Sequence, residues 1–114
     1  TRYIDMGIAW GSSHKHIESG YELPLNEWHH IAVTMDNVAH KIQFFIDGLP
    51  FGMPHENITE WLINWNHNLF LGDYDGSGRW SWTGKIDDTR YYDKILSPKE
   101  IFDIYNFENI KHSI

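Results

Sequence analysis

The chain has 114 residues, no cysteine and a formal net charge of -7 at pH 7 with histidine taken as neutral. This length suits one domain, and the lack of thiols excludes disulfides, thiolate zinc sites and a cysteine nucleophile. The negative charge argues against nucleic acid and anionic membranes as partners, and no apolar run is long enough for membrane insertion. Aromatic residues make up 16% of the chain, and they can serve either to fill the core or to form a ligand-binding surface.

The first half of the chain alternates apolar and polar residues with a period of two, which is typical of β-strands. This pattern predicts strands over 3–9, 17–20, 28–35 and 41–47, with a return strand that begins at 49–51. Both faces of 28–35 can be buried, which favours a central strand between two layers and places Trp28 in the core. Asp47-Gly48 is a strong turn signal, and Pro50 and Pro54 predict that the return strand is an edge or irregular strand.

The second half predicts shorter strands and one helix. The strands are expected at 60–63, 69–71, 80–82 and 85–92, with a polar, glycine-rich loop over 72–78. Ser97-Pro98-Lys99-Glu100 has the pattern of a capping box with proline at the first helical position. Apolar residues at Ile101, Ile104 and Tyr105 then have helical spacing, and Asn106 is the expected stop.

Four motifs, in chain order, resemble laminin-G-like domains: 28–34, 42–48, 69–72 with 84–92, and the helix start at 96–101. The resemblance covers about residues 28–105. It implies an all-β fold, an antiparallel two-sheet jelly-roll sandwich of the concanavalin A-like type, with one short helix near the C-terminus. Residues 1–114 would then form one laminin-G-like domain. The family normally has more chain before Trp28, and the sequence starts at Thr1, so we expect missing N-terminal strands or a piece of a larger protein.

A candidate cation site lies in the predicted loop at 72–78. Asp73 and Asp75, at alternate positions, and Ser77 can direct oxygen atoms toward one calcium ion. Gly84 stands where an EF-hand would place its bidentate glutamate, so a complete EF-hand is excluded. The alternative is a solvated hairpin loop in which aspartate and glycine serve turn geometry.

A candidate ligand surface is formed by aromatic residues in the second half. Trp80 and Trp82 share a face if their segment is a strand, and Trp61, Trp65 and Asn66 lie in a stretch rich in amides and aromatics. Sugar rings stack on tryptophan while their hydroxyls pair with polar side chains, so a glycan is a reasonable partner. The alternative is that these tryptophans belong to the sandwich core.

Weaker signals concern histidines and paired carboxylates. His14 and His16 have a spacing that can chelate zinc, but strand or surface histidines are the simpler interpretation. Asp87 and Asp88 are adjacent, so on a strand they would point to opposite faces and could not form a hydrolytic pair. A structural role for Asp87, with Arg90 or with backbone amides, is expected instead.

Together these features predict a non-catalytic binding or adhesion module of a secreted, cell-surface or virion-surface protein. It would recognise a glycan or a surface glycoprotein, with calcium as a candidate cofactor. Two alternatives stay open: a structural β-sandwich that packs against neighbouring domains or subunits, and an accessory part of a glycoside hydrolase. The extracellular location rests on the resemblance only.

Overall fold

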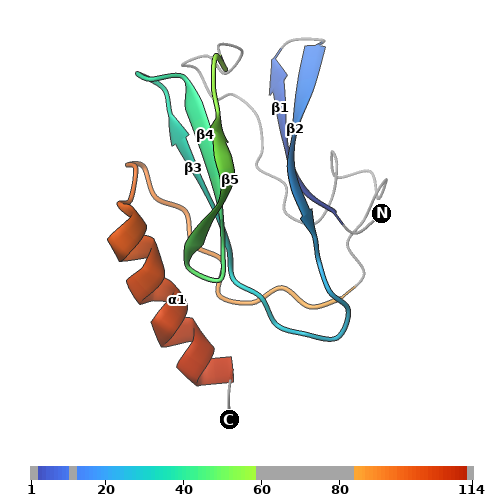
Figure 1. Cartoon of the computed structure of the whole chain (residues 1–114), viewed down its shortest axis with the longest axis vertical. Coiled ribbons are helices and arrows are strands. Elements are labelled where there is room, and N and C mark those ends of the chain that lie inside the picture. The colour runs from blue at the N-terminus through green and yellow to red at the C-terminus, as the bar shows by residue number, and fades with distance from the viewer. Residues whose placement is uncertain (1–2, 11–12, 59–83, 113–114) are drawn as a thin grey trace.

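The computed structural model describes residues 3–10, 13–58 and 84–112 (Figure 1). These residues form five strands and one helix: β1 (Tyr3–Trp10), β2 (Ser13–Glu22), β3 (Ile31–Asp36), β4 (Lys41–Ile46), β5 (Leu49–His55) and α1 (Pro98–His112). β1 and β2 pair in a two-stranded sheet, and the other strands form a three-stranded sheet in the order β3-β4-β5. All pairs are antiparallel, so the prediction of a mostly β fold in two sheets with a C-terminal helix is confirmed.

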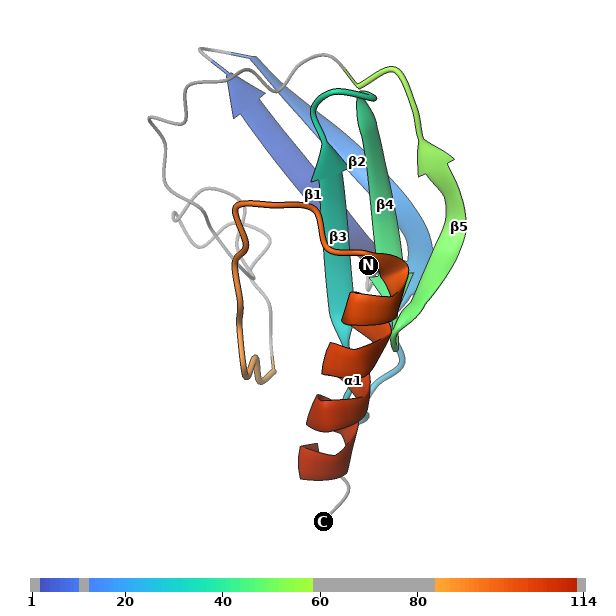
Figure 2. The same cartoon turned by 90° about the vertical axis from the view of Figure 1, so that its left-hand side faces the viewer.

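The three parts lie in layers. The β1–β2 sheet lies against one face of the three-stranded sheet, and α1 runs along the opposite face (Figures 1 and 2). The core between the sheets contains Ile17, Ile42, Phe44 and Ile58, with Ile4, Met6 and Met35 packed against them. Full burial of such a side chain stabilises the fold by about 1.5–3 kcal/mol relative to leaving it exposed.

Alternation along β4 explains why two layers can cover it. Ile42 and Phe44 point into the core between the sheets, and Phe45 therefore points to the other face, where it is only 3% exposed. On that face α1 contributes Ile101, which is 2% exposed, and the half-buried Tyr105. Among the described strands the central one is thus β4, with β3 and β5 on its two sides, and the strand predicted at 28–35 begins only at Ile31.

In the described part of the sheet β5 is an outer strand, which agrees with its prolines. A proline has no N–H to donate to a neighbouring strand, so it is tolerated at an edge. Pro50 pairs with Phe45, and the register between β4 and β5 shifts between Ile42 and Phe44. The β4–β5 turn has positive φ at Asp47 and Gly48, which aspartate tolerates and glycine adopts freely.

The capping box at the start of α1 is confirmed. The Glu100 N–H donates to Ser97 Oγ over 3.1 Å, and the Ser97 N–H donates to Glu100 Oε1 over 2.9 Å. These two bonds satisfy backbone donors that an unprotected helix start would leave without partners. The expected stop at Asn106 is wrong, because α1 continues to His112. None of the helices in the described ranges combines the length and apolarity needed to cross a bilayer.

Residues 85–92 were expected to be a strand, and this prediction is wrong. The segment has no regular secondary structure, and its φ at Asp88 is +55°, which interrupts an extended chain. Ile86 and Tyr91 are more than half exposed, so the alternation in this segment does not bury one face. The predicted strands at 60–63, 69–71 and 80–82 lie outside the described residues.

Candidate functional site

The ligand and cation residues predicted from the sequence all fall between positions 59 and 83, outside the described residues. They are Trp61, Trp65, Asn66, Asp73, Asp75, Ser77, Trp80 and Trp82. Their assignment to a glycan surface and a calcium loop stays a prediction. In the ranges that are described, no group of three or more His, Asp or Glu side chains is arranged to hold a metal ion. His16 instead lies beside Asp5 on β1, with Nδ1 3.5 Å from Oδ2.

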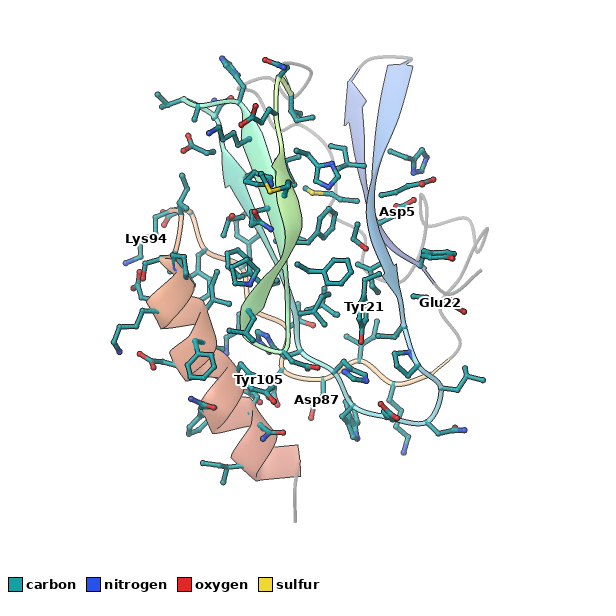
Figure 3. All side chains as sticks on the ribbon, viewed as in Figure 1. Asp5, Tyr21, Glu22, Asp87, Lys94 and Tyr105 are labelled. Atoms are coloured by element: carbon teal, nitrogen blue, oxygen red, sulfur yellow. The ribbon has the colours of Figure 1, made fainter. Side chains whose placement is uncertain are left out.

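A polar cluster joins elements at one end of the sandwich. We call it the His29 cluster, and its members are Tyr21, Glu27, His29, His30 and Asp47. His29 lies between two carboxylates: its Nδ1 is 2.8 Å from Asp47 Oδ2, and its Nε2 is 2.9 Å from Glu27 Oε1. The Tyr21 ring meets the His29 ring edge-on at a centroid distance of 6.2 Å. Tyr21 lies between the two sheets near this end (Figure 3).

Asp47 connects the loop before β3 to the β4–β5 turn. Its Oδ1 accepts the His30 N–H over 2.9 Å, while its own N–H donates to the His30 carbonyl over 2.8 Å. The positive φ of +50° at Asp47 turns the chain so that backbone and side chain both face His30. One aspartate therefore holds two consecutive histidines by three hydrogen bonds.

The environment of the cluster changes how its members titrate. Burial tends to lower the pKa of His29, but the hydrogen bonds to Asp47 and Glu27 and their negative charges raise this pKa above its usual value. Burial and the charges of Asp47 and Glu27 raise the pKa of Tyr21, so its phenol stays neutral. His29 therefore keeps its positive charge to higher pH than an ordinary histidine does.

His30 points away from His29, toward α1. Its ring centroid is 6.1 Å from that of Tyr105, and its Nδ1 is buried without a hydrogen-bond partner in the described structure. Burial lowers the pKa of His30, the charge of Asp47 opposes this change, and the charge of Arg90 lowers the pKa further. The pKa values of these two adjacent histidines are therefore shifted in opposite directions.

A second network fastens the segment before α1 to the helix itself. Arg90 Nη2 donates to Glu108 Oε1, and Lys111 Nζ donates to Asp88 Oδ2, each over 2.7 Å. The Asp88 N–H donates to Asp87 Oδ1 over 2.9 Å, so the expected structural role of Asp87 with a backbone amide is confirmed. Asp87 lies at the same end of the molecule as Tyr21 and Tyr105 (Figure 3).

Glu108 is the buried member of this second network, with a side chain that is 9% exposed. The hydrogen bond to Asp88, then burial and the negative charge of Asp88, raise the pKa of Glu108 against the opposing charges of Lys111 and Arg90. The folded chain therefore holds a proton on Glu108 more firmly than the unfolded chain does. This contribution to stability is present at low pH and is lost as the pH rises through the raised pKa.

Replacement of Glu108 by glutamine is expected to remove this part of the pH dependence of stability. Glutamine keeps the shape of the side chain and does not titrate. Urea midpoints measured from about pH 4 to about pH 8 check the expectation. Glu56→Gln is the control, because the Glu56 side chain is 59% exposed and pairs only across the surface with Lys41. A profile that is unchanged in Glu108→Gln would contradict the assignment.

Trp28 was expected in the core, and the structure contradicts this. It lies in the loop between β2 and β3, one residue before His29, and is 49% exposed. The pattern of apolar residues extended the predicted strand to Trp28, whereas β3 begins only at Ile31. The signal that could have corrected this is local: Pro24, Asn26 and Glu27 directly before Trp28 favour a loop over a strand.

Comparisons with known proteins agree with this fold. The Laminin_G_3 family model, described as the concanavalin A-like lectin/glucanases superfamily, matches residues 4–102. Among solved structures, a crystal structure of an S-layer domain-containing protein (residues 221–444) from Clostridium thermocellum matches with 23% sequence identity and a TM-score of 0.51. That match covers 89% of this chain and 49% of the other, so the chain spans about half the length of that structure.

At this level of identity the structural match shows the fold alone. The comparison with curated proteins gives no match. The family model, in contrast, extends from residue 4 in β1 to residue 102 in the first part of α1, and so covers all five described strands. The chain therefore belongs to the concanavalin A-like lectin/glucanases superfamily, as a laminin-G-like member.

Proposed function

We propose that this chain is a non-catalytic binding and adhesion module of a secreted, cell-surface or virion-surface protein, and that it recognises glycans. One observation carries the proposal: the half-exposed indole of Trp28 lies on a loop that the His29 cluster fastens to the sandwich. An aromatic face held in place loses little conformational freedom when a sugar ring stacks on it. Asn26 and Glu27, exposed in the same loop, offer polar groups for sugar hydroxyls.

Three further observations support parts of this proposal. The superfamily contains lectins, and the S-layer domain-containing protein of similar fold suggests a surface location. The described carboxylates Asp47, Asp88 and Glu108 each pair with a histidine, lysine or arginine, which favours a structural use over acid–base catalysis. We extend the proposal to a jelly-roll connection of the sheets, and to calcium at Asp73, Asp75 and Ser77 as an aid to binding.

Replacement of Trp28 by alanine is expected to weaken glycan binding by roughly tenfold or more, since exposed tryptophans are frequent hot spots of recognition. The measurement is a glycan-array screen of the wild-type chain, followed by titration of the best ligand with each variant. Phe107→Ala is the matched control, because it removes an aromatic ring that is 64% exposed on α1. Equal affinities of the Trp28→Ala variant and the wild type would show that Trp28 is not part of the binding surface.

A second candidate function is structural, and a different observation favours it. Apolar side chains are exposed on α1 and on the segment before it: Tyr91 and Ile95 on the segment, Phe107 and Ile110 on the helix. Such residues are typical of a surface that packs against a neighbouring domain or subunit. A wild-type chain that binds no glycan on the array, with or without millimolar calcium, would favour this structural role.

A further inference from the structure

The contacts of His29 define its protonation state. Each ring nitrogen faces a carboxylate oxygen, at 2.8 Å on the Asp47 side and 2.9 Å on the Glu27 side. An ionised carboxylate can only accept a hydrogen bond, so both nitrogens must carry a proton to complete both bonds. A neutral imidazole has one N–H, and its other nitrogen would direct a lone pair at a carboxylate.

Among the residues that the structure describes, the neighbours of His29 offer no other way to satisfy this arrangement. The described titratable groups that face it are the Tyr21 phenol from β2, Glu27 from its own loop and Asp47 from the β4–β5 turn. The Tyr21 ring meets His29 by its edge and makes no hydrogen bond to it that would replace a lost proton. On the side of α1, Tyr105 and Arg90 act on His30 instead.

His29 lies where the exposed part of the loop meets its bound end. At one end of the loop Leu23 is buried, and at the other His30 is bound to the backbone and side chain of Asp47. Residues 24–28 between these two points are exposed. The Glu27–His29–Asp47 bridge links this exposed part, next to Trp28, to the β4–β5 turn.

We propose that the loop at residues 23–30 is a pH-sensitive latch, closed while a doubly protonated His29 bridges Glu27 and Asp47 and loosened when one ring proton leaves. On release, one of the two carboxylates loses its hydrogen-bond donor and faces a nitrogen lone pair. The loop then keeps the His30–Asp47 bonds but loses the tie next to Trp28. The raised pKa of His29 supports a closed latch that persists to higher pH than an ordinary histidine would allow.

The test is the backbone order of residues 25–29, measured by NMR as order parameters of the amide groups in steps from about pH 5 to about pH 8. In the wild-type chain, these order parameters are expected to fall from about 0.85 to below about 0.6 through the His29 transition, which the ring resonances report directly. In His29→Gln this step should vanish, with low order parameters at every pH. His16→Gln is the matched control, because His16 also pairs with a carboxylate but lies on β2.

A milder variant keeps the test decisive if His29→Gln does not fold. In Glu27→Gln one carboxylate is replaced by an amide on an exposed side chain, so the His29 transition should move to lower pH with the fold unchanged. A step in the order parameters that persists in His29→Gln, or a His29 transition that stays in place in Glu27→Gln, would overturn the latch. No ligand is used, so the outcome is independent of the proposed glycan binding.

Discussion

Replacement of Phe44 by alanine is expected to lower the free energy of unfolding by about 3–5 kcal/mol. Phe44 is fully buried, and it belongs to the core cluster with Ile17, Ile42 and Ile58. Its ring also meets the His55 ring edge-on at a centroid distance of 5.6 Å. The truncation removes apolar contacts from both sheets at once and leaves a cavity between them. For a small domain this is a large share of a total stability of about 5–15 kcal/mol.

Urea denaturation followed by circular dichroism measures this loss. Phe107→Ala is again the control, since it makes the same chemical change at a side chain that is 64% exposed. We expect the control to change the free energy of unfolding by no more than about 0.5 kcal/mol. If the two variants were equally stable, the core between the sheets would not be where the structure places it.

Replacement of Gly48 by alanine is expected to lower the free energy of unfolding by about 2–4 kcal/mol. Two effects contribute to this loss. The φ of Gly48 is +83°, a conformation that disfavours any residue with a Cβ. An added Cβ would also lie 2.8 Å from Cδ2 of Tyr105 and 3.0 Å from Cδ2 of Phe102. Both neighbours belong to α1, so the substitution would push the helix away from the β4–β5 turn.

Gly52→Ala separates the two causes. Gly52 has a similar φ of +72°, but an added Cβ there would meet no atom within 4 Å. Its variant should therefore show the backbone strain alone, about 1 kcal/mol. The difference between the two urea midpoints measures how closely α1 packs against the turn. A Gly48→Ala variant no less stable than Gly52→Ala would contradict that packing.

Features with a local cause were predictable from the sequence. The capping box depends only on residues 97–100, and the β4–β5 turn depends on Asp47-Gly48. The alternation in 41–47 predicted the strand β4, because a period of two places Ile42 and Phe44 on the same face. In each case the residues that determine the structure are neighbours in the chain.

Features that depend on distant residues were not predictable. Residues 85–92 alternate like a strand, but contacts with α1 through Arg90 and Asp88 accompany a backbone turn at Asp88. The His29 cluster joins residues 18 positions apart, and no spacing rule brings Asp47 to His29 before the hairpin is folded. The residues chosen from composition and motif, from Trp61 to Trp82, lie outside the described ranges and stay predictions.

The way in which the two sheets meet has a mechanical consequence. In the described part of the chain, the backbone of β1 pairs with that of β2, and the contact with β4 is made by side chains such as Ile17 and Phe44. Side-chain packing resists separation of two layers more strongly than it resists a small displacement parallel to them. A small shear of the β1–β2 ribbon across the three-stranded sheet would therefore need rotamer changes in the core but would leave the described backbone pairing within each sheet intact. Since the loop that carries Trp28 leaves from the end of β2, such sliding would move the indole relative to the β4–β5 turn, and the tie through His29 would set its range.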